Sequence, residues 1–162
     1  MKNLLMKYEA LSAVQHEQVQ QIELLDEQKA CMGGIHGGLH ALTARPRADI
    51  QGYVLLVADV PRGFFLLKRR SLLPPWARGQ AATLHGLMID RRHQGLGLGK
   101  ACVQALPELI ADLWPEIEHL MLAVDPGNAA ALKLYHASGW TFSDDMPPLA
   151  THVERHMIRA LR

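Results

Sequence analysis

Cysteine, aromatic residues and long apolar runs are all scarce in this sequence of 162 residues, which has 2 cysteines and 6% aromatic residues. Cys31 and Cys102 lack the spacing of a metal or redox motif. No feature of the sequence indicates a disulfide between them. The longest apolar stretch, near residues 53–58, is far shorter than the roughly 18 residues that cross a bilayer. The first ten residues lack the apolar segment of a signal peptide. We therefore expect a soluble, cytoplasmic protein without a membrane partner.

A large net charge is also missing, because 17 Lys and Arg oppose 16 Asp and Glu, for a net charge of +1. The cations are unevenly spread, and residues 61–100 hold eight of them against one acidic residue, a local charge of +7. A nucleic-acid-binding domain is usually basic as a whole, so we expect no nucleic-acid partner. The basic segment predicts either a local anionic ligand or a solvated basic surface.

The composition predicts one globular domain over residues 1–162, because 49% of the residues are apolar and Gly (13) and Pro (9) are at ordinary levels. Ser12, with Gln15 three residues later, is typical of a capping box that opens a helix. His36 and His40 have the spacing of helical metal ligands, but four nearby glycines argue against a helix and we expect no metal site. The elements predicted for the N-terminal half are a strand at 2–11, a helix at 13–30, an irregular connection at 33–38, and a hairpin of 53–60 and 64–68 that turns at 61–63.

The C-terminal half reads as alternating strands and helices. Pro107 is expected to kink or split an amphipathic helix that begins at Leu98. Asn128 and Gly139 have the residue types that begin and end a helix. The predicted elements are strands at 83–90, 120–124, 140–142 and 153–158 and helices from 98 and at 128–138. This order predicts an α+β, or mixed α/β, fold built on one sheet.

The most informative motif is Gln-Gly-Leu-Gly-Leu-Gly-Lys at residues 94–100, between a predicted strand and a predicted helix. Glycine lets the backbone approach a ligand closely, and a helix start offers free N–H groups and a positive dipole end, which favour phosphate. A Walker A loop would need Ser or Thr where Ala101 stands. A dinucleotide fingerprint would need Gly in place of Lys100 and an acidic residue about 20 residues later. The turn therefore predicts a phosphate or pyrophosphate site of a third kind.

The pattern Gln/Arg-x-x-Gly-x-Gly/Ala at residues 94–99, followed by a second block at 120–142, resembles the GNAT superfamily of acyl-CoA N-acyltransferases. Met88-Ile89-Asp90 before the turn is similar to the branch that includes spermine/spermidine-type acetyltransferases. The resemblance implies a mostly antiparallel, twisted sheet of about six to seven strands flanked by about four helices. It also implies acetyl-CoA as the cofactor, no metal, a small-molecule or peptide amine as acceptor, and a homodimer.

The resemblance further implies roles for single residues. The pantetheine arm would pair with the backbone of residues 87–89 where neighbouring strands splay apart, and the N–H of Met88 or Ile89 would bind the oxyanion. Tyr135 matches the residue that protonates the leaving thiolate, and a thiol pKa of about 8.5 lies near a phenol pKa of about 10. Arg91, Arg92 or Lys100 would meet the 3′-phosphate. The expected cofactor contacts are Leu87, Met88, Ile89, Gln94, Gly95, Leu96, Gly97, Leu98, Gly99, Lys100, Asn128 and Ala131.

The proton acceptor departs from the family pattern, because the position at which many relatives have Glu corresponds to Thr83. His85 lies on the same face of the predicted strand and has an ordinary pKa of about 6.5, so it is the predicted base. A water chain, or an amine that arrives partly deprotonated, is the alternative. The predicted activity is direct transfer of an acetyl group from acetyl-CoA to a primary amine, and the alternative is a non-catalytic acyl-CoA-binding sensor or regulatory module.

Overall fold

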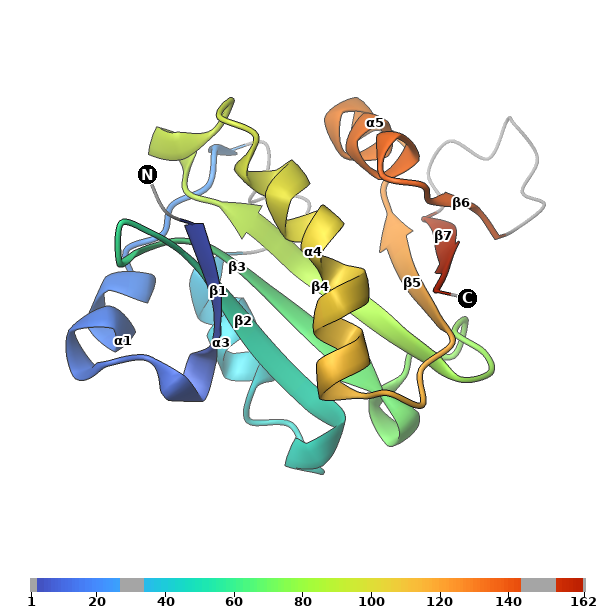
Figure 1. Ribbon diagram of the computed structural model, residues 1–162. Helices are drawn as coiled ribbons and strands as arrows, with labels where there is room; N and C mark the ends of the chain where they lie inside the picture. Colours follow the sequence, from blue (N-terminus) through green and yellow to red (C-terminus); the bar gives the residue numbers. More distant parts are fainter. Residues whose placement is uncertain (1–2, 27–33, 144–153, 162) are drawn as a thin grey trace.

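A computed structural model of the protein describes residues 3–26, 34–143 and 154–161. These residues form a seven-stranded sheet in the order β1-β2-β3-β4-β5-β7-β6, in which β4 and β5 are parallel and the other neighbours antiparallel (Figure 1). The strands are β1 (Asn3–Lys7), β2 (Ile50–Val57), β3 (Val60–Arg69), β4 (Ala81–Ile89), β5 (His119–Val124), β6 (Thr141–Phe142) and β7 (Arg155–Ala160). The described helices are α1 (Ala13–Val19), α3 (Ile35–Ala41), α4 (Leu98–Leu113) and α5 (Ala129–Ala137). The predicted mixed α/β class is confirmed.

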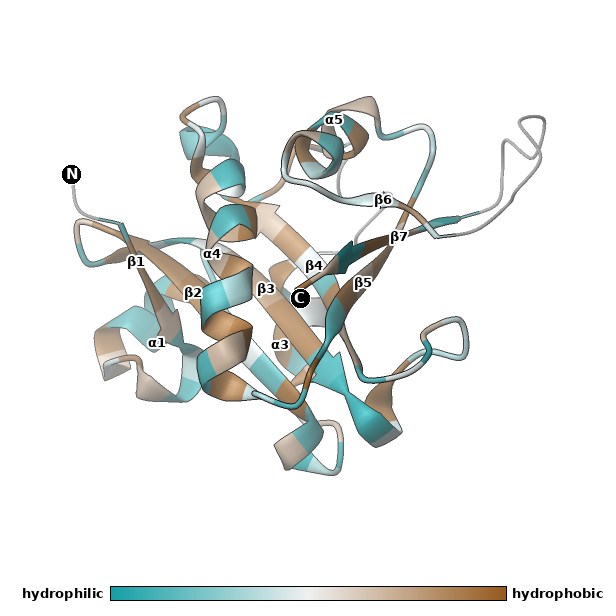
Figure 2. Ribbon diagram, turned by 45° about the vertical axis from the view of Figure 1, so that its right-hand side comes forward, coloured by the Kyte–Doolittle hydropathy of each residue, from teal (hydrophilic) through white to brown (hydrophobic). Residues whose placement is uncertain are grey.

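Helices cover both faces of the sheet, because the strands at its centre are apolar on both sides. Alternate residues of a strand point to opposite faces, so Tyr53, Leu55 and Val57 pack with α4 and α5. Val54 and Leu56 pack with α1 and α3 on the other face. Figure 2 shows the hydrophobic central strands between helices whose outer sides carry the hydrophilic residues. The sheet therefore separates two apolar cores.

The hairpin turn begins three residues earlier than the sequence predicts, at residue 58 instead of residue 61. Ala58 and Asp59 connect β2 to β3, and both have positive φ, 50° and 67°. Two consecutive residues of this kind make the tight connection whose twist matches the two strands. Pro61 and Gly63 lie within β3, so the predicted turn at 61–63 is wrong.

The first helix is much shorter than the predicted range of 13–30. The capping box of Ser12 and Gln15 is present, but α1 ends at Val19. Beyond it, the buried residues Ile22 and Leu24 alternate with Glu23, a period of two that suits extended chain and not a helix. Residues 27–30 of the predicted helix lie outside the described residues. Likewise β1 ends at Lys7, and a short 3₁₀ helix occupies residues 8–10 of the predicted strand.

Helix α3 contradicts the irregular connection predicted from its glycines. Gly37 and Gly38 both lie within the helix. A Cβ on Gly38 would stand 2.7 Å from the ring of Phe64, whereas one on Gly37 would have nothing within 4 Å. Gly38 is therefore tolerated in the helix because α3 packs against β3 at this point.

The two glycines predict opposite stability changes. Gly38→Ala should lower the free energy of unfolding by about 1–3 kcal/mol, because the fully buried Phe64 must move. Gly37→Ala should leave it unchanged or raise it by up to about 1 kcal/mol, because Ala favours a helix. Urea unfolding of the two variants tests the pair, and equal midpoints would contradict the close packing of α3 on β3.

The C-terminal elements follow the prediction, except that Pro107 does not split α4 (Figure 1). Leu106 and Ile110 are 1% and 0% exposed beside it. Burial of these side chains offsets the one backbone hydrogen bond that proline cannot donate. Asn128 caps α5 and Gly139, with φ 90°, follows its end. The last strand begins at Arg155, and Val153 of the predicted range 153–158 lies outside the described residues.

Candidate functional site

A cavity of about 640 Å³ opens where two parallel strands separate. Strands β4 and β5 pair only between residues 81–83 and 119–121 and then diverge toward their C-terminal ends (Figure 1). The walls come from the unpaired part of both strands, residues 93–99, the first part of α5, and two more distant residues, Leu24 and Glu154. Backbone groups on the facing edges of β4 and β5 are therefore free to bind an extended ligand.

A bulge in β4 shapes this edge of the cavity. Phe64 is paired with Met88 and Leu66 with His85, so two residues of β4, Gly86 and Leu87, stand opposite one residue of β3. Gly86 has φ 60°, the conformation that glycine supplies at this type of bulge. An isolated glycine in a predicted strand is a signal for such a bulge, but the strand predicted at 83–90 is a regular one.

The glycine turn delivers the start of α4 to the cavity. Gly95 and Gly97 have φ 80° and 78°, and Gly97 is the N-cap of α4. As a glycine it has no side chain to accept the N–H groups of the first helical turn, so these groups can meet a ligand. Gln94 Nε2 donates to the Ile89 carbonyl at 3.0 Å, which ties the turn back to the end of β4.

Most of the expected cofactor residues meet in this cavity. Leu96 and Lys100 face solvent on the same turn, and Leu96 is 62% exposed. Both expected catalytic residues, His85 and Tyr135, lie on the cavity wall. The expected cofactor residues that line it are Leu87, Met88, Ile89, Gln94, Gly95, Gly97, Leu98, Gly99, Asn128 and Ala131.

His85 shares a strand face with Thr83, as the alternation of side chains predicts, and Thr83 Oγ1 lies 2.7 Å from His85 Nε2. Burial, with a smaller effect from the positive charge of Lys68, lowers the pKa of His85 to about 4. The imidazole is therefore neutral at pH 7. It can exchange hydrogen bonds with a ligand, but it is a weaker base than the ordinary histidine on which the prediction relied.

Tyr135 sits on α5 with 9% of its surface exposed, and its ring centroid is 5.7 Å from that of Trp140. Burial, with a smaller effect from Cys102, raises the pKa of Tyr135 to about 12. The phenol therefore stays protonated at any physiological pH. Complete transfer of its proton to a thiolate of pKa about 8.5 is uphill by about 4–5 kcal/mol, so its stronger role is to donate a hydrogen bond.

Asn128 has a structural role that the sequence predicts. Its side-chain Oδ1 accepts the N–H of Ala131 at 3.1 Å, which caps α5. Because Oδ1 is already engaged, a hydrogen bond from Asn128 to a ligand would come from its Nδ2.

Several lining residues were not expected. Leu84, Leu122 and Val124 belong to predicted strands, and the separation of β4 from β5 would have pointed to them. No sequence signal places Leu24 or Glu154 here. Leu24 lies more than 60 residues before the end of β4, and Glu154 lies about 30 residues after the end of β5. The other unexpected members are Gly86, His93, Ala123, Asp125, Ala130 and Leu134.

The basic segment 61–100 does not supply the cavity with cations. No Lys or Arg is among the described residues that line it. Five of the eight cations instead pair with carboxylates from several parts of the chain: Arg62 and Arg92 with Asp90, Arg69 with Asp49 and Glu116, Arg70 with Glu116, and Arg91 with Glu23. Arg91 and Arg92, two of the expected 3′-phosphate contacts, are thus already engaged. The groups left to attract an anion here are the N–H groups at the start of α4 and the exposed Lys100 in its first turn.

Among residues 3–26, 34–143 and 154–161, no group of three or more His, Cys, Asp and Glu side chains could hold a metal ion. In the same ranges, no helix has the length and apolar character needed to span a membrane.

The comparisons with known proteins agree with the geometry. The model of the acetyltransferase (GNAT) family matches residues 10–140, and the chain belongs to this family. It is 32% identical to the uncharacterized N-acetyltransferase YbbJ of Bacillus subtilis over 89 residues. This aligned stretch is 54% of this chain and 56% of YbbJ. It is 33% identical to the spermine/spermidine N(1)-acetyltransferase of the same organism over 63 residues. This aligned stretch is 39% of this chain and 41% of that protein. The chain thus spans about half the length of each.

The fold is shared with solved structures. An acetyltransferase of Bacillus subtilis in complex with CoA superposes with a TM-score of 0.63 at 14% identity, over 99% of this chain and 100% of that one. The predicted GNAT fold is confirmed.

Proposed function

We propose that this chain transfers an acetyl group from acetyl-CoA to the nitrogen of a primary amine by direct attack. One observation carries the proposal: a single cavity joins a glycine turn at a helix start, an unpaired strand edge and a buried phenol. The turn suits a pyrophosphate, the strand edge suits an extended amide-containing arm, and the phenol suits a departing thiolate. The family to which the chain belongs supports the same activity.

The two substrates enter from opposite faces of the sheet. The turn, α4 and α5 lie on the face whose core contains Tyr135 and Leu98, and this face takes acetyl-CoA. Leu24 belongs to the core of the other face, with α1 and α3, yet lines the same cavity. The amine therefore reaches the thioester from the face of α1 and α3.

Different groups of the chain then stabilise the charges that develop during the reaction. As the new C–N bond forms, the N–H of Met88 or Ile89 stabilises the oxyanion. As the C–S bond breaks, the Tyr135 hydroxyl donates a hydrogen bond to the departing thiolate, which leaves as CoA thiolate and takes its proton from water. With a pKa of about 4, His85 orients the amine, and the amine's excess proton leaves through water. A dedicated base of pKa 6.5 is not required when the amine enters in its neutral form.

A free-thiol release assay across an amine panel tests the proposal. Thiol should appear only when acetyl-CoA and an amine are both present. The panel includes polyamines, because one relative by sequence is a spermine/spermidine N(1)-acetyltransferase and the acidic residue Glu154 lines the cavity. Tight CoA binding with no thiol release for any amine would favour the sensor or regulatory module. A homodimer and a cytoplasmic location stay predictions from the sequence.

The pH profile should reflect the amine and not the phenol. Because the pKa of Tyr135 is raised to about 12, the phenol stays protonated below that pH and remains a donor. The value of kcat/KM should rise with pH as the amine deprotonates and should show no decline up to about pH 10.5. Steady-state rates between pH 6 and pH 10.5 measure this profile. A decline with a midpoint well below pH 10 would contradict the role of Tyr135, and an inflection near pH 6.5 would restore His85 as the base.

A further inference from the structure

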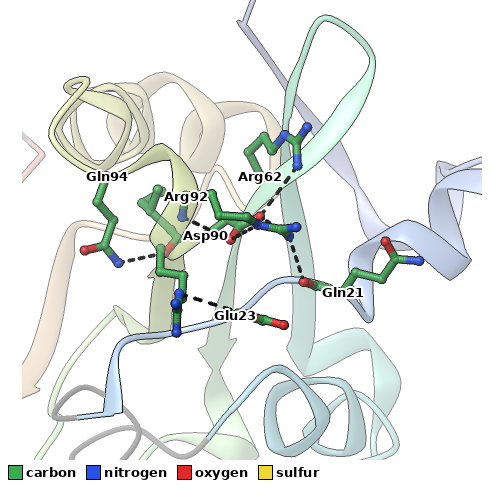
Figure 3. Close-up of polar contacts among 8 residues, drawn as sticks. Gln21, Glu23, Arg62, Asp90, Arg92 and Gln94 are labelled. Atoms are coloured by element: carbon green, nitrogen blue, oxygen red, sulfur yellow. Dashed lines mark hydrogen bonds and ion pairs between the residues drawn. The ribbon is translucent and has the colours of Figure 1, made fainter.

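A buried carboxylate at the end of β4 takes no part in the steps above. Asp90 is fully buried, and its Oδ2 lies 2.7 Å from Arg92 Nη2 and 3.6 Å from Arg62 Nη1 (Figure 3). Burial favours a neutral carboxyl, but the hydrogen bonds from Arg92 outweigh it and the pKa of Asp90 lies below its ordinary value. Asp90 is therefore charged at neutral pH and joins the end of β4 to β3.

The same cluster fastens a third segment, residues 21–24, which follows α1. Arg92 Nη2 also donates to the Gln21 carbonyl at 3.1 Å, so this guanidinium bridges Asp90 and the segment. The Arg91 N–H donates to the Glu23 carbonyl at 2.7 Å, and the Asp90 carboxylate accepts the Glu23 N–H. Both backbone polar groups of Glu23 are thus bonded to the two residues that follow β4.

This attachment fixes one wall of the cavity. Leu24 directly follows Glu23, is 2% exposed and lines the cavity. A shift of the Glu23 backbone necessarily moves Leu24. The cofactor turn is held by a different contact, the bond from Gln94 to the Ile89 carbonyl.

We propose that Asp90 and Arg92 are positioning residues for the amine substrate: they hold residues 21–24 against the end of β4 and so place the cavity wall that Leu24 forms. This inference rests on the proposed function, in which the amine enters from the face that carries Leu24. Charge-assisted, bidentate contacts are the strong and directional ones, which suits a pair that holds one segment at a set distance from another.

Asp90→Asn and Arg92→Gln in the full chain test the inference. For an amine identified by the thiol-release assay, KM should rise about tenfold or more, because small displacements of a substrate-binding wall are costly. The Kd for CoA, measured by calorimetry, should change by less than about threefold, because the Gln94 contact is intact. The Arg92 side chain is 51% exposed, so Arg92→Gln provides the measurement if Asp90→Asn does not fold.

Asp49→Asn is the matched control. Asp49 is a second buried carboxylate, bonded to Ser71 at 2.7 Å and paired with Arg69 at 3.4 Å, and it does not line the cavity. This variant should lose stability but leave the amine KM and the CoA Kd within about twofold of the wild type. An unchanged amine KM in the Asp90 and Arg92 variants, or an equal rise in the CoA Kd, would overturn the positioning role.

A readout without catalysis separates this inference from the proposed function. If the wild-type protein acetylates no amine, the proposed function fails, and hydrogen exchange still measures the attachment. The Arg91 and Glu23 amides should exchange faster in Arg92→Gln than in the wild type. Unchanged exchange at both amides would overturn the claim that Arg92 holds the segment.

Discussion

Replacing Tyr135 with phenylalanine is expected to lower kcat about a hundredfold, the scale of a lost proton or hydrogen-bond donor in the transition state. The CoA Kd should stay within about twofold, because the ring remains in place and only the hydroxyl is removed. Burial keeps this phenol protonated, so the loss should be the same at pH 7 and pH 9. Steady-state kinetics and calorimetry on the same preparation measure both quantities.

Tyr53→Phe is the control for that result. Tyr53 is also buried, at 5% exposed, and its pKa is also raised to about 12, but it stacks on Phe65 and does not line the cavity. Removal of the Tyr53 hydroxyl should leave kcat unchanged. Equal losses in the two variants would point to a general effect on stability, and full activity of Tyr135→Phe would remove the phenol from the mechanism.

Gly97→Val should weaken CoA binding by about tenfold or more. Gly97 has φ 78°, a conformation that costs a β-branched residue on the order of 1–3 kcal/mol. Relief of this strain would rotate the N–H groups at the start of α4 away from the cavity. A Cβ at this position meets nothing within 4 Å, so the expected effect comes from the backbone. Calorimetric titration with CoA measures it.

Gly79→Val carries a comparable backbone strain far from the turn. Gly79 has φ 71° and lies beside His119 outside the cavity. This control should lower the melting temperature and leave the CoA Kd unchanged. If both variants bind CoA as the wild type does, the glycine turn is not the pyrophosphate site. If both weaken binding equally, the effect is one of global stability.

Sequence patterns identified the parts of the site that depend on local backbone chemistry. The glycines at 95 and 97 adopt the conformation that their residue type allows, and Asn128 caps the helix that it precedes. Alternation along one strand placed Thr83 and His85 on the same face. Each of these features depends on residues within a few positions of one another, which is the range over which periodicity and capping rules apply.

Packing between distant segments explains the predictions that failed. The helicity of α3 depends on contact between Gly38 and Phe64, which are 26 positions apart. The basic residues at 61–100 left an anionic ligand and a solvated basic surface open, and sequence alone did not show that several of them pair with Glu23, Asp49 and Glu116 from elsewhere in the chain. Local composition does not show where a charge finds its counter-ion.

The near-neutral, cysteine-poor sequence already specified a mixed α/β domain with a glycine turn suited to phosphate, because strand alternation, helix capping and glycine conformations are short-range effects. Tertiary structure decided what the site can do. It separated β4 from β5 to form the cavity, brought Leu24 to it from the opposite face, and moved the pKa of His85 and of Tyr135 in opposite directions by burial. Burial depends on the whole chain, so the acidity of these two groups could not be read from their neighbours in sequence.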